Sequence, residues 1–383
     1  MKNGIIALLF LLVVFLLLYV LGAFNYGSIT DHDYNGAFLS TREEAVSKSP
    51  VWKVGIALDL RDGMGRETVR GIQFARDYLN SRGGILGKYI ELEIHGEATS
   101  PQQNKLLTQE FCERPDIALL IGGLNTEEIP TLRSITQFQG LPFVSPVASL
   151  PDSLPELKPD MTFSYFPPLS ILTNKLATEL ARRGKKRLLV VSPGDDSYGS
   201  IFGTKLERRL HEDKSFVEIY RVNFKNPARF ADLYQSLKLF TENRTIDAII
   251  FTDDEPCLKV LGEVIKALNI SIEVWGNDYL DITHSENSLK DFPCPIFYTA
   301  FGNCRFVNKD FIKAWQEKFG SPPSLWNQLG AQCLLGFAEA VERESKYKPG
   351  KIIDIMRELH ERKLALGKVP TEVNIRQMPR GKQ

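Results

Sequence analysis

Polar side chains follow several apolar runs of this chain, at positions where they could bind a small molecule. Asn125 and Thr126 come after the apolar run 118–121 and a Gly-Gly pair, and they open a predicted helix. A helix N-terminus presents free N–H groups and the positive end of a dipole, so this junction could bind a carboxylate. The same two side chains could instead serve only to cap that helix.

Three further polar side chains stand at comparable places. Ser149 follows a short apolar run, Tyr198 opens a predicted helix, and Asp278 follows the run 273–275. A carboxylate at position 278, once removed from water, would form strong charge-assisted hydrogen bonds with an ammonium group. The alternatives are an ordinary turn at Ser149, a tyrosine that covers a helix start, and a solvated loop acid.

The sequence lacks the motifs of the common α/β enzymes. No G-x-G-x-x-G follows the first predicted strand, and no G-x-S-x-G is present. The five histidines are scattered, and the five cysteines form no C-x-x-C pair. No histidine is placed to complete a zinc site. We therefore expect no enzymatic activity, no cofactor and no metal. Cys294 and Cys304 could form a disulfide in an oxidising compartment, or remain free thiols.

Short apolar strands and amphipathic helices must position these side chains. The first predicted helix, 66–81, ends at Gly83 and Gly84, which can take the positive φ that terminates a helix. Gly87 then permits a tight turn straight into the strand 90–94. Units of this kind, with minimal loops, build a parallel sheet covered by helices, so the fold class is α/β.

The βα pattern runs in two successive blocks. The first block ends near residue 145, and the second runs from the helix 169–183 to the strand 273–275. A strand at 296–300, three helices and a last strand at 373–375 follow. The 383 residues suit a membrane segment plus two core-forming units. Lys+Arg and Asp+Glu are 47 each, a balance that does not favour nucleic acid as a partner.

The N-terminus carries an apolar run typical of a membrane anchor. Residues 5–24 are about 20 apolar residues without a charge, which is the length that a helix needs to cross a bilayer. A cleaved signal peptide is the alternative, although its apolar region is usually shorter. Lys2 precedes the run and acids follow it, so the large C-terminal part is expected outside the cytoplasm. The polar residues 25–50 are interpreted as a tether.

Several stretches of the chain, in their order, point to a known family. The most specific is GIQFARDYLNSRGGILGKYIELEIHGEATSP, and four weaker ones follow: ALLIGGLNTEE, LPFVSPVAS, VVSPGDDSYGSIFG and EVWGNDYL. From residue 53 to the C-terminus the chain resembles the type I periplasmic substrate-binding proteins. Within them it is similar to the branched-chain amino-acid-binding (Leu/Ile/Val-binding-like) family.

The resemblance implies two Rossmann-like lobes with parallel sheets, joined by three crossing segments and preceded by the predicted transmembrane helix. The crossings are expected near 163–166, near 280–283 and just before 373. The expected parts of the chain are an anchor (1–24), a tether (25–50), a first lobe (51–165 with 281–365) and a second lobe (166–280 with 366–383).

The resemblance also assigns roles to the candidate residues. Asn125 and Thr126 match the position that holds a ligand carboxylate. Ser149 matches a ligand-binding hydroxyl, and Val147 a residue that contacts ligand through its backbone. In the second lobe, Tyr198 would stack against or hydrogen-bond the ligand. Asp278 aligns with the acid that pairs with an α-ammonium group.

Two departures from the family pattern affect the choice of ligand. Glu127 and Glu128 follow Thr126 and would oppose an incoming carboxylate unless they face away. Acids at 253–255 stand where the family often has a tyrosine-glycine pair. A cationic or neutral polar solute therefore remains open beside an amino acid.

The function implied is capture of a small polar solute outside the cytoplasm and its delivery to an ABC permease. An alternative is a ligand-sensing or regulatory subunit of a membrane receptor or envelope complex, without a role in transport. Only about four residues precede the apolar run, so a sensor would need a partner protein in the membrane.

Overall fold

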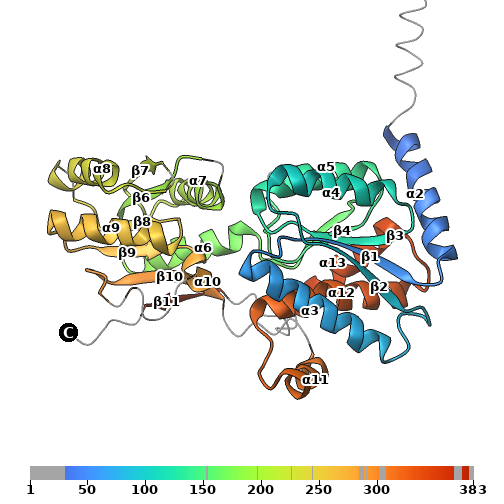
Figure 1. The fold of residues 1–383 in the computed structure, drawn as a ribbon. Coiled ribbons are helices and arrows are strands. Elements are labelled where there is room, and N and C mark those ends of the chain that lie inside the picture. Colours follow the sequence, from blue (N-terminus) through green and yellow to red (C-terminus); the bar gives the residue numbers. More distant parts are fainter. Residues whose placement is uncertain are drawn as a thin grey trace, which may run out of the picture.

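The computed structural model describes residues 31–151, 154–195, 197–225, 227–243, 245–283, 289, 291–301, 308–365 and 373–378. They form two α/β lobes that lie side by side (Figure 1). The first lobe comprises the described residues of 31–164 and 308–365. The second comprises those of 169–301 and 373–378.

The first lobe contains a five-stranded sheet of order β2-β1-β3-β4-β5, in which all neighbouring strands are parallel. Its strands are β1 (Trp52–Ala57), β2 (Ile90–His95), β3 (Ile117–Gly122), β4 (Phe143–Ser145) and β5 (Thr162–Ser164). Helices α4 and α5 lie on one face and α3, α12 and α13 on the other (Figure 1). Helix α11 lies beyond α3 (Figure 1). The helical elements of this lobe are α3 (Gly63–Asn80), α4 (Pro101–Glu113), the 3-10 turn η1 (Thr126–Glu128), α5 (Ile129–Phe138), α11 (Lys309–Phe319), α12 (Leu325–Glu344) and α13 (Pro349–Ala365).

The second lobe contains a six-stranded sheet of order β11-β10-β9-β8-β6-β7. Its strands are β6 (Arg187–Pro193), β7 (Glu218–Phe224), β8 (Ala248–Phe251), β9 (Glu273–Gly276), β10 (Ile296–Phe301) and β11 (Val373–Gln377). Its helices are α6 (Leu169–Arg182), α7 (Tyr198–His211), α8 (Phe230–Asn243), α9 (Glu255–Leu268) and α10 (Tyr279–Thr283). Alternate residues of β6 face opposite sides: Leu188 and Val190 pack with α6 and α7, and Leu189 and Val191 with α8 and α9.

The crossings between the lobes differ in part from the expectation. The first runs through residues 165–168, between β5 and α6. The second was expected near 280–283, with 281–365 in the first lobe. However, β10 pairs parallel with β9 and antiparallel with β11, so residues 296–301 belong to the second sheet. The chain therefore remains in the second lobe through Phe301, and residues 302–307 lie outside the described residues. The third was expected just before 373, and residues 366–372 lie outside the described residues.

The predicted turn between α3 and β2 is confirmed. Gly83, Gly84 and Gly87 have φ of 95°, 76° and 80°, all in the region that favours glycine. A Cβ at position 84 would lie 2.1 Å from the carbonyl oxygen of Lys88, so the turn also needs the missing side chain.

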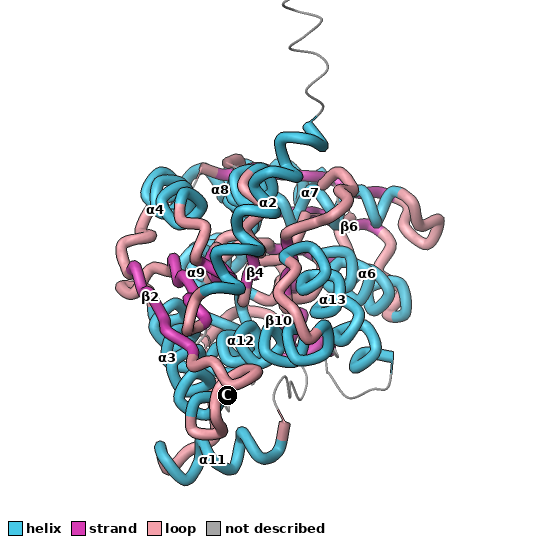
Figure 2. Tube along the Cα trace, turned by 90° about the vertical axis from the view of Figure 1, so that its right-hand side faces the viewer, coloured by secondary structure: helices cyan, strands magenta, loops and turns pink. Residues whose placement is uncertain are grey.

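Within the predicted tether (25–50), residues 31–48 form helix α2 (Asp31–Lys48). The helix packs on the end of the first lobe that faces away from the second lobe (Figures 1 and 2). Of its described side chains, Arg42 and Val46 are buried. The Arg42 guanidinium donates to the carbonyl oxygens of Cys112, Arg114 and Ile117, each at 2.8 Å. An amphipathic helix is recognised in a sequence by a stripe of apolar residues. A helix that packs through a buried arginine lacks this signal, so the sequence did not indicate α2.

Replacing Arg42 with methionine should lower the free energy of unfolding by about 2 kcal/mol, because three carbonyl groups lose their donor. The loss is limited because α2 lies at the surface and water can reach these groups if the helix detaches. Urea unfolding measures it. The control is Glu44→Gln, which removes an exposed ion pair with Lys48 and should change little. Equal effects of the two substitutions would contradict the proposed docking.

Two predictions fall outside the described part of the chain. The apolar run 5–24 is one, and no helix among the described residues is long and apolar enough to cross a membrane. Cys304, the predicted partner of Cys294, is the other.

Candidate functional site

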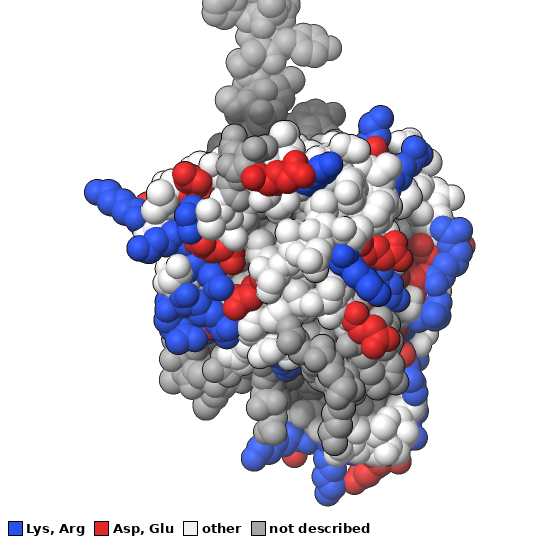
Figure 3. All heavy atoms as spheres, turned by 90° about the vertical axis from the view of Figure 1, so that its left-hand side faces the viewer, with Lys and Arg blue, Asp and Glu red and all other residues white. Residues whose placement is uncertain are grey.

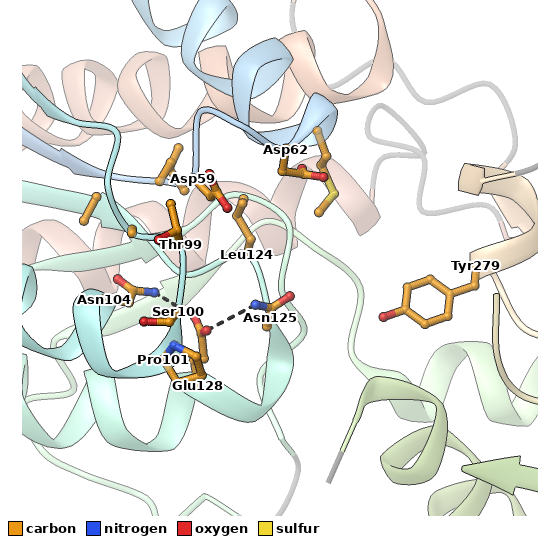
Figure 4. Close-up of a pocket in the computed structure, with 14 residues that line it drawn as sticks. Asp59, Asp62, Thr99, Ser100, Pro101, Asn104, Leu124, Asn125, Glu128 and Tyr279 are labelled. Carbon is orange, nitrogen blue, oxygen red and sulfur yellow. Dashed lines mark hydrogen bonds between the residues drawn. The ribbon is translucent and has the colours of Figure 1, made fainter. Parts of the chain in front are cut away.

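A cavity of about 370 Å³ lies between the lobes, at the carboxyl ends of β1, β2 and β3. Ligands of open parallel sheets bind at this edge. The first lobe contributes its wall from the segments that follow the three strands, and Tyr279 of the second lobe points its hydroxyl toward that wall (Figure 4). The cavity is therefore bounded by both lobes.

Local structure holds the polar side chains of this wall in place. Asp62 caps α3, and its carboxylate accepts from the backbone N–H of Gly65 at 2.9 Å. Ser100 caps α4 in the same way, from Gln103. Gly123, with φ of 75°, turns the chain after β3 so that Asn125 reaches the cavity.

Glu128 is a buried acid in the wall of the cavity. Its carboxylate accepts from the side-chain amides of Asn104 at 2.7 Å and Asn125 at 3.1 Å (Figure 4). Asn125 makes no capping hydrogen bond with its side chain, so capping is not its role. The two amides fix an anionic group of the protein at the junction where a ligand carboxylate was expected.

The second lobe brings Tyr198 and Asp278 together. The Tyr198 hydroxyl donates to Asp278 Oδ1 at 2.7 Å, and Tyr279 packs against the Tyr198 ring at a centroid distance of 4.9 Å. Asp278 is 1% exposed, so it is not a solvated loop acid. Burial raises its pKa to about 6, and the Tyr198 hydrogen bond opposes that rise.

Asp253 and Asp254 follow β8 in the same lobe. Asp254 caps α9 by accepting from the backbone N–H of Cys257 at 3.1 Å. Asp253 is 4% exposed, and within the described part of the chain its Oδ2 has no hydrogen-bond partner. One potential ligand atom from each of these three residues lies within 4.8 Å of the others. Burial raises the pKa of the Cys257 thiol to about 12, so the thiol is protonated near neutral pH when no metal ion is bound.

The six predicted residues have different surroundings. Asn125 lines the cavity, and Tyr198 and Asp278 lie behind Tyr279. Thr126 and Val147 are buried. Ser149 is buried and donates to the carbonyl oxygen of Pro167 at 2.6 Å, within the first crossing. Solute contact by any of the six stays a prediction.

Sequence reasoning missed part of the cavity wall. Asp59 and Asp62 follow the end of β1 and line the cavity, and the rule applied to other strand ends would have found them. Asn104 and Tyr279 gave no such signal, because Asn104 lies one turn into α4 and Tyr279 begins α10. Their place depends on how the lobes meet.

Comparisons with known proteins agree with this architecture. A family model described as "Periplasmic binding protein" matches residues 59–374. The Leu/Ile/Val-binding protein homolog 7 of Brucella melitensis is 20% identical over 299 residues, which are 71% of this chain and 72% of that protein.

Solved structures share the fold at low sequence identity. An ABC transporter substrate-binding protein from Desulfitobacterium hafniense in complex with Leu is 19% identical with a TM-score of 0.62, covering 81% of this chain and 88% of that one. A leucine-binding protein from Thermotoga maritima is 18% identical with a TM-score of 0.66, covering 80% and 87%. A solute-binding protein of an ABC transporter from R. palustris, in complex with benzoate, is 16% identical with a TM-score of 0.59, covering 87% and 94%.

Proposed function

The chain belongs to the periplasmic binding protein family, and we propose that it captures a small polar solute between its lobes and delivers it to an ABC transporter. As a member of a binding-protein family it is not an enzyme. The related proteins bind leucine in one structure and benzoate in another, so the fold accepts solutes of different charge.

The observation that carries the proposal is the cavity with walls from both lobes. Tyr279 of the second lobe lines it together with residues of the first lobe, Asn125 and Glu128 among them. A solute that contacts both walls stabilises the closed arrangement over an open one, because only the closed arrangement makes both sets of contacts. A partner that recognises the closed form can then receive the solute.

The six residues predicted from the sequence are our proposed solute contacts in this cleft. Asn125 is supported by its place in the cavity wall. Tyr198 and Asp278 are supported by their hydrogen bond behind Tyr279. For Thr126, Val147 and Ser149 the support is the resemblance alone, and Ser149 has a second use in binding the first crossing.

The membrane attachment is part of the proposal. Residues 5–24 would form a single helix in the cytoplasmic membrane, with the two lobes outside the cytoplasm. Helix α2, docked through Arg42, would then hold the first lobe near the membrane and leave the second lobe to move. A transporter bound at the membrane would thus meet one lobe in a fixed orientation.

Thermal unfolding of the full chain in detergent, followed by tryptophan fluorescence, tests the function. Amino acids, amides, ureas, polyamines and aromatic acids form the library. A true solute at 100 times its dissociation constant should add about 2.7 kcal/mol of stability. The proposal fails if every compound at millimolar concentration leaves the melting temperature unchanged.

A further inference from the structure

The first-lobe wall of the cavity already contains its own anion. Glu128 accepts one N–H of the Asn104 amide and one of the Asn125 amide, at 2.7 and 3.1 Å, and these two N–H groups are not available to a ligand carboxylate. Asp59 and Asp62 line the same cavity. A carboxylate placed here would meet three acids, which is unfavourable in a partly desolvated cleft.

Each lobe contains a buried acceptor atom without a hydrogen-bond partner among the described residues, and the side chains of Asn277 and Ser197, next to Asp278 and Tyr198, likewise have none there. Asn104 is 2% exposed and lines the cavity, and its Oδ1 is the unpaired acceptor of the first lobe. Asp253, in the second lobe, has an unpartnered Oδ2 and is 4% exposed. A buried acceptor without a partner is costly, so a ligand N–H or O–H donor that reached either atom would remove that cost.

Acids also approach one another across the cleft. Partial desolvation raises the pKa of Glu127, a backbone hydrogen bond lowers it, and the charges of Glu128 and Asp195 raise it further, although the side chain keeps contact with solvent. Asp195 belongs to the second lobe, so the two lobes present like charges to each other. Glu127, Asp253 and Asp254 lie close enough to Tyr279 to raise the pKa of its hydroxyl further, beyond the effect of burial.

Two positive side chains near these acids form ion pairs of their own. Arg61 approaches Asp59 with an Nε–Oδ1 distance of 3.4 Å, and its side chain is 72% exposed. Lys259 on α9 pairs with Glu255 at 2.7 Å. The far end of the second lobe, in contrast, shows positive and negative side chains interspersed around an uncharged area (Figure 3). That face therefore shows no excess of acids.

We propose that the solute is an organic cation, an amine or guanidinium compound whose N–H donors face Glu128 and Asn104 in the first lobe and Asp253 in the second. The inference rests on the proposed function and names the class of solute for the same cavity. Ammonium and guanidinium groups supply several donors and a positive charge, which is what acidic walls with unpaired acceptors require.

The same charges would make closure depend on the solute. Without a cation, bringing Glu127 and Glu128 toward Asp195 and Asp253 is opposed by like-charge repulsion. A cation between the walls removes that repulsion and adds charge-assisted hydrogen bonds on both sides. The empty protein is then biased toward an open arrangement, and the loaded one toward a closed arrangement.

Thermal unfolding of the full chain, after treatment with EDTA, tests the inference with matched probes. Putrescine, spermidine and agmatine are the cations, and 1,4-butanediol is the uncharged counterpart of putrescine. Leucine and benzoate represent a zwitterion and an anion, and calcium and zinc chloride represent metal ions alone. We expect at least one organic cation to raise the melting temperature while butanediol does not. Its affinity should fall as NaCl is raised.

Two variants locate the binding. Glu128→Gln and Asp253→Asn each remove one carboxylate from a different lobe, and each should weaken binding of that cation at least tenfold. Glu110→Gln is the control, because it makes the same charge change at an exposed position on α4 and should leave affinity unchanged. Melting of each variant without solute verifies folding, and the two lobes provide independent variants if one does not fold.

The outcomes separate this inference from the function on which it rests. A shift with leucine or benzoate, and none with the cations, overturns the cationic class and leaves solute binding intact. A shift with calcium or zinc alone, and none with amines, also overturns it. A cation that binds both variants as tightly as it binds Glu110→Gln excludes this site. If no compound of any charge produces a shift, both the inference and the proposed function fail.

Discussion

Replacing Asp278 with asparagine should make the protein more stable by about 3 kcal/mol near pH 7.5, relative to the effect of the same substitution near pH 3. The carboxyl is 1% exposed, and burial raises its pKa from 3.8 to about 6. Below pH 3.8 it is protonated in both the folded and the unfolded states. Above pH 6 the folded state must hold a buried charge, and the shift of about two units corresponds to about 3 kcal/mol.

Urea unfolding of both proteins at the two pH values measures this difference. The wild-type contribution of Asp278 falls as pH rises through the window from 3.8 to about 6, because the folded state binds the proton more tightly. Asp291→Asn, which changes an exposed carboxyl of the same lobe, is the control and should show no such pH dependence. If the effect of Asp278→Asn is independent of pH, the carboxyl is not buried as described. An acid that costs stability near neutral pH is a candidate functional group.

Replacing Gly71 with alanine should lower the free energy of unfolding by at least about 3 kcal/mol. At the crossing of α3 and α12, a Cβ at position 71 would lie 2.0 Å from the carbonyl oxygen of Asn327. Backbone rather than a flexible side chain blocks the space, so the helices must separate. Asn327 Nδ2 also donates to the carbonyl oxygen of Glu67 at 2.7 Å, and separation would strain this hydrogen bond.

The matched control is Gly63→Ala on the same helix, where the nearest atom to a new Cβ is Nη2 of Arg66 at 3.8 Å. Alanine is the better helix former, so this variant should be as stable as the parent or slightly more stable. Thermal unfolding compares the two. Equal stability of both variants would mean that α3 and α12 do not cross as closely as described. The crossing matters for the site because Asp62 caps the first turn of α3.

Local sequence signals were sufficient for the parts of the fold that depend on neighbouring residues. The turn at Gly83, Gly84 and Gly87 was predictable, because only glycine takes those φ values readily. The alternation of short apolar strands with amphipathic helices likewise indicated two parallel sheets. Strand β10 was assigned to the wrong lobe because its apolar residues fit either sheet. Only its pairing with β9 shows that it belongs to the second lobe. Helix α2 was missed because a buried arginine makes its contacts.

The candidate site, like the fold, was predictable where local sequence signals were sufficient and not where distant segments meet. Tyr198 and Asp278 were found from their places after β6 and β9, and the fold brought them within a hydrogen bond. Glu128 was noticed in the sequence as an obstacle to a carboxylate. That it is held by Asn104 and Asn125 could not be predicted, because α4 and η1 meet only in the folded lobe. Side chains such as Tyr279 enter the site only through the approach of the second lobe.

Closure of the two lobes around a solute is the central claim, and the distance between them measures it directly. Gln102 and Lys225 are exposed and follow strands of opposite lobes. Each can be replaced by cysteine and spin-labelled, in a protein in which Cys304 is replaced by serine. Pulsed electron resonance on the full chain should give a shorter and narrower distance distribution when a solute that raises the melting temperature is at saturation. An identical distribution with and without that solute would contradict the account.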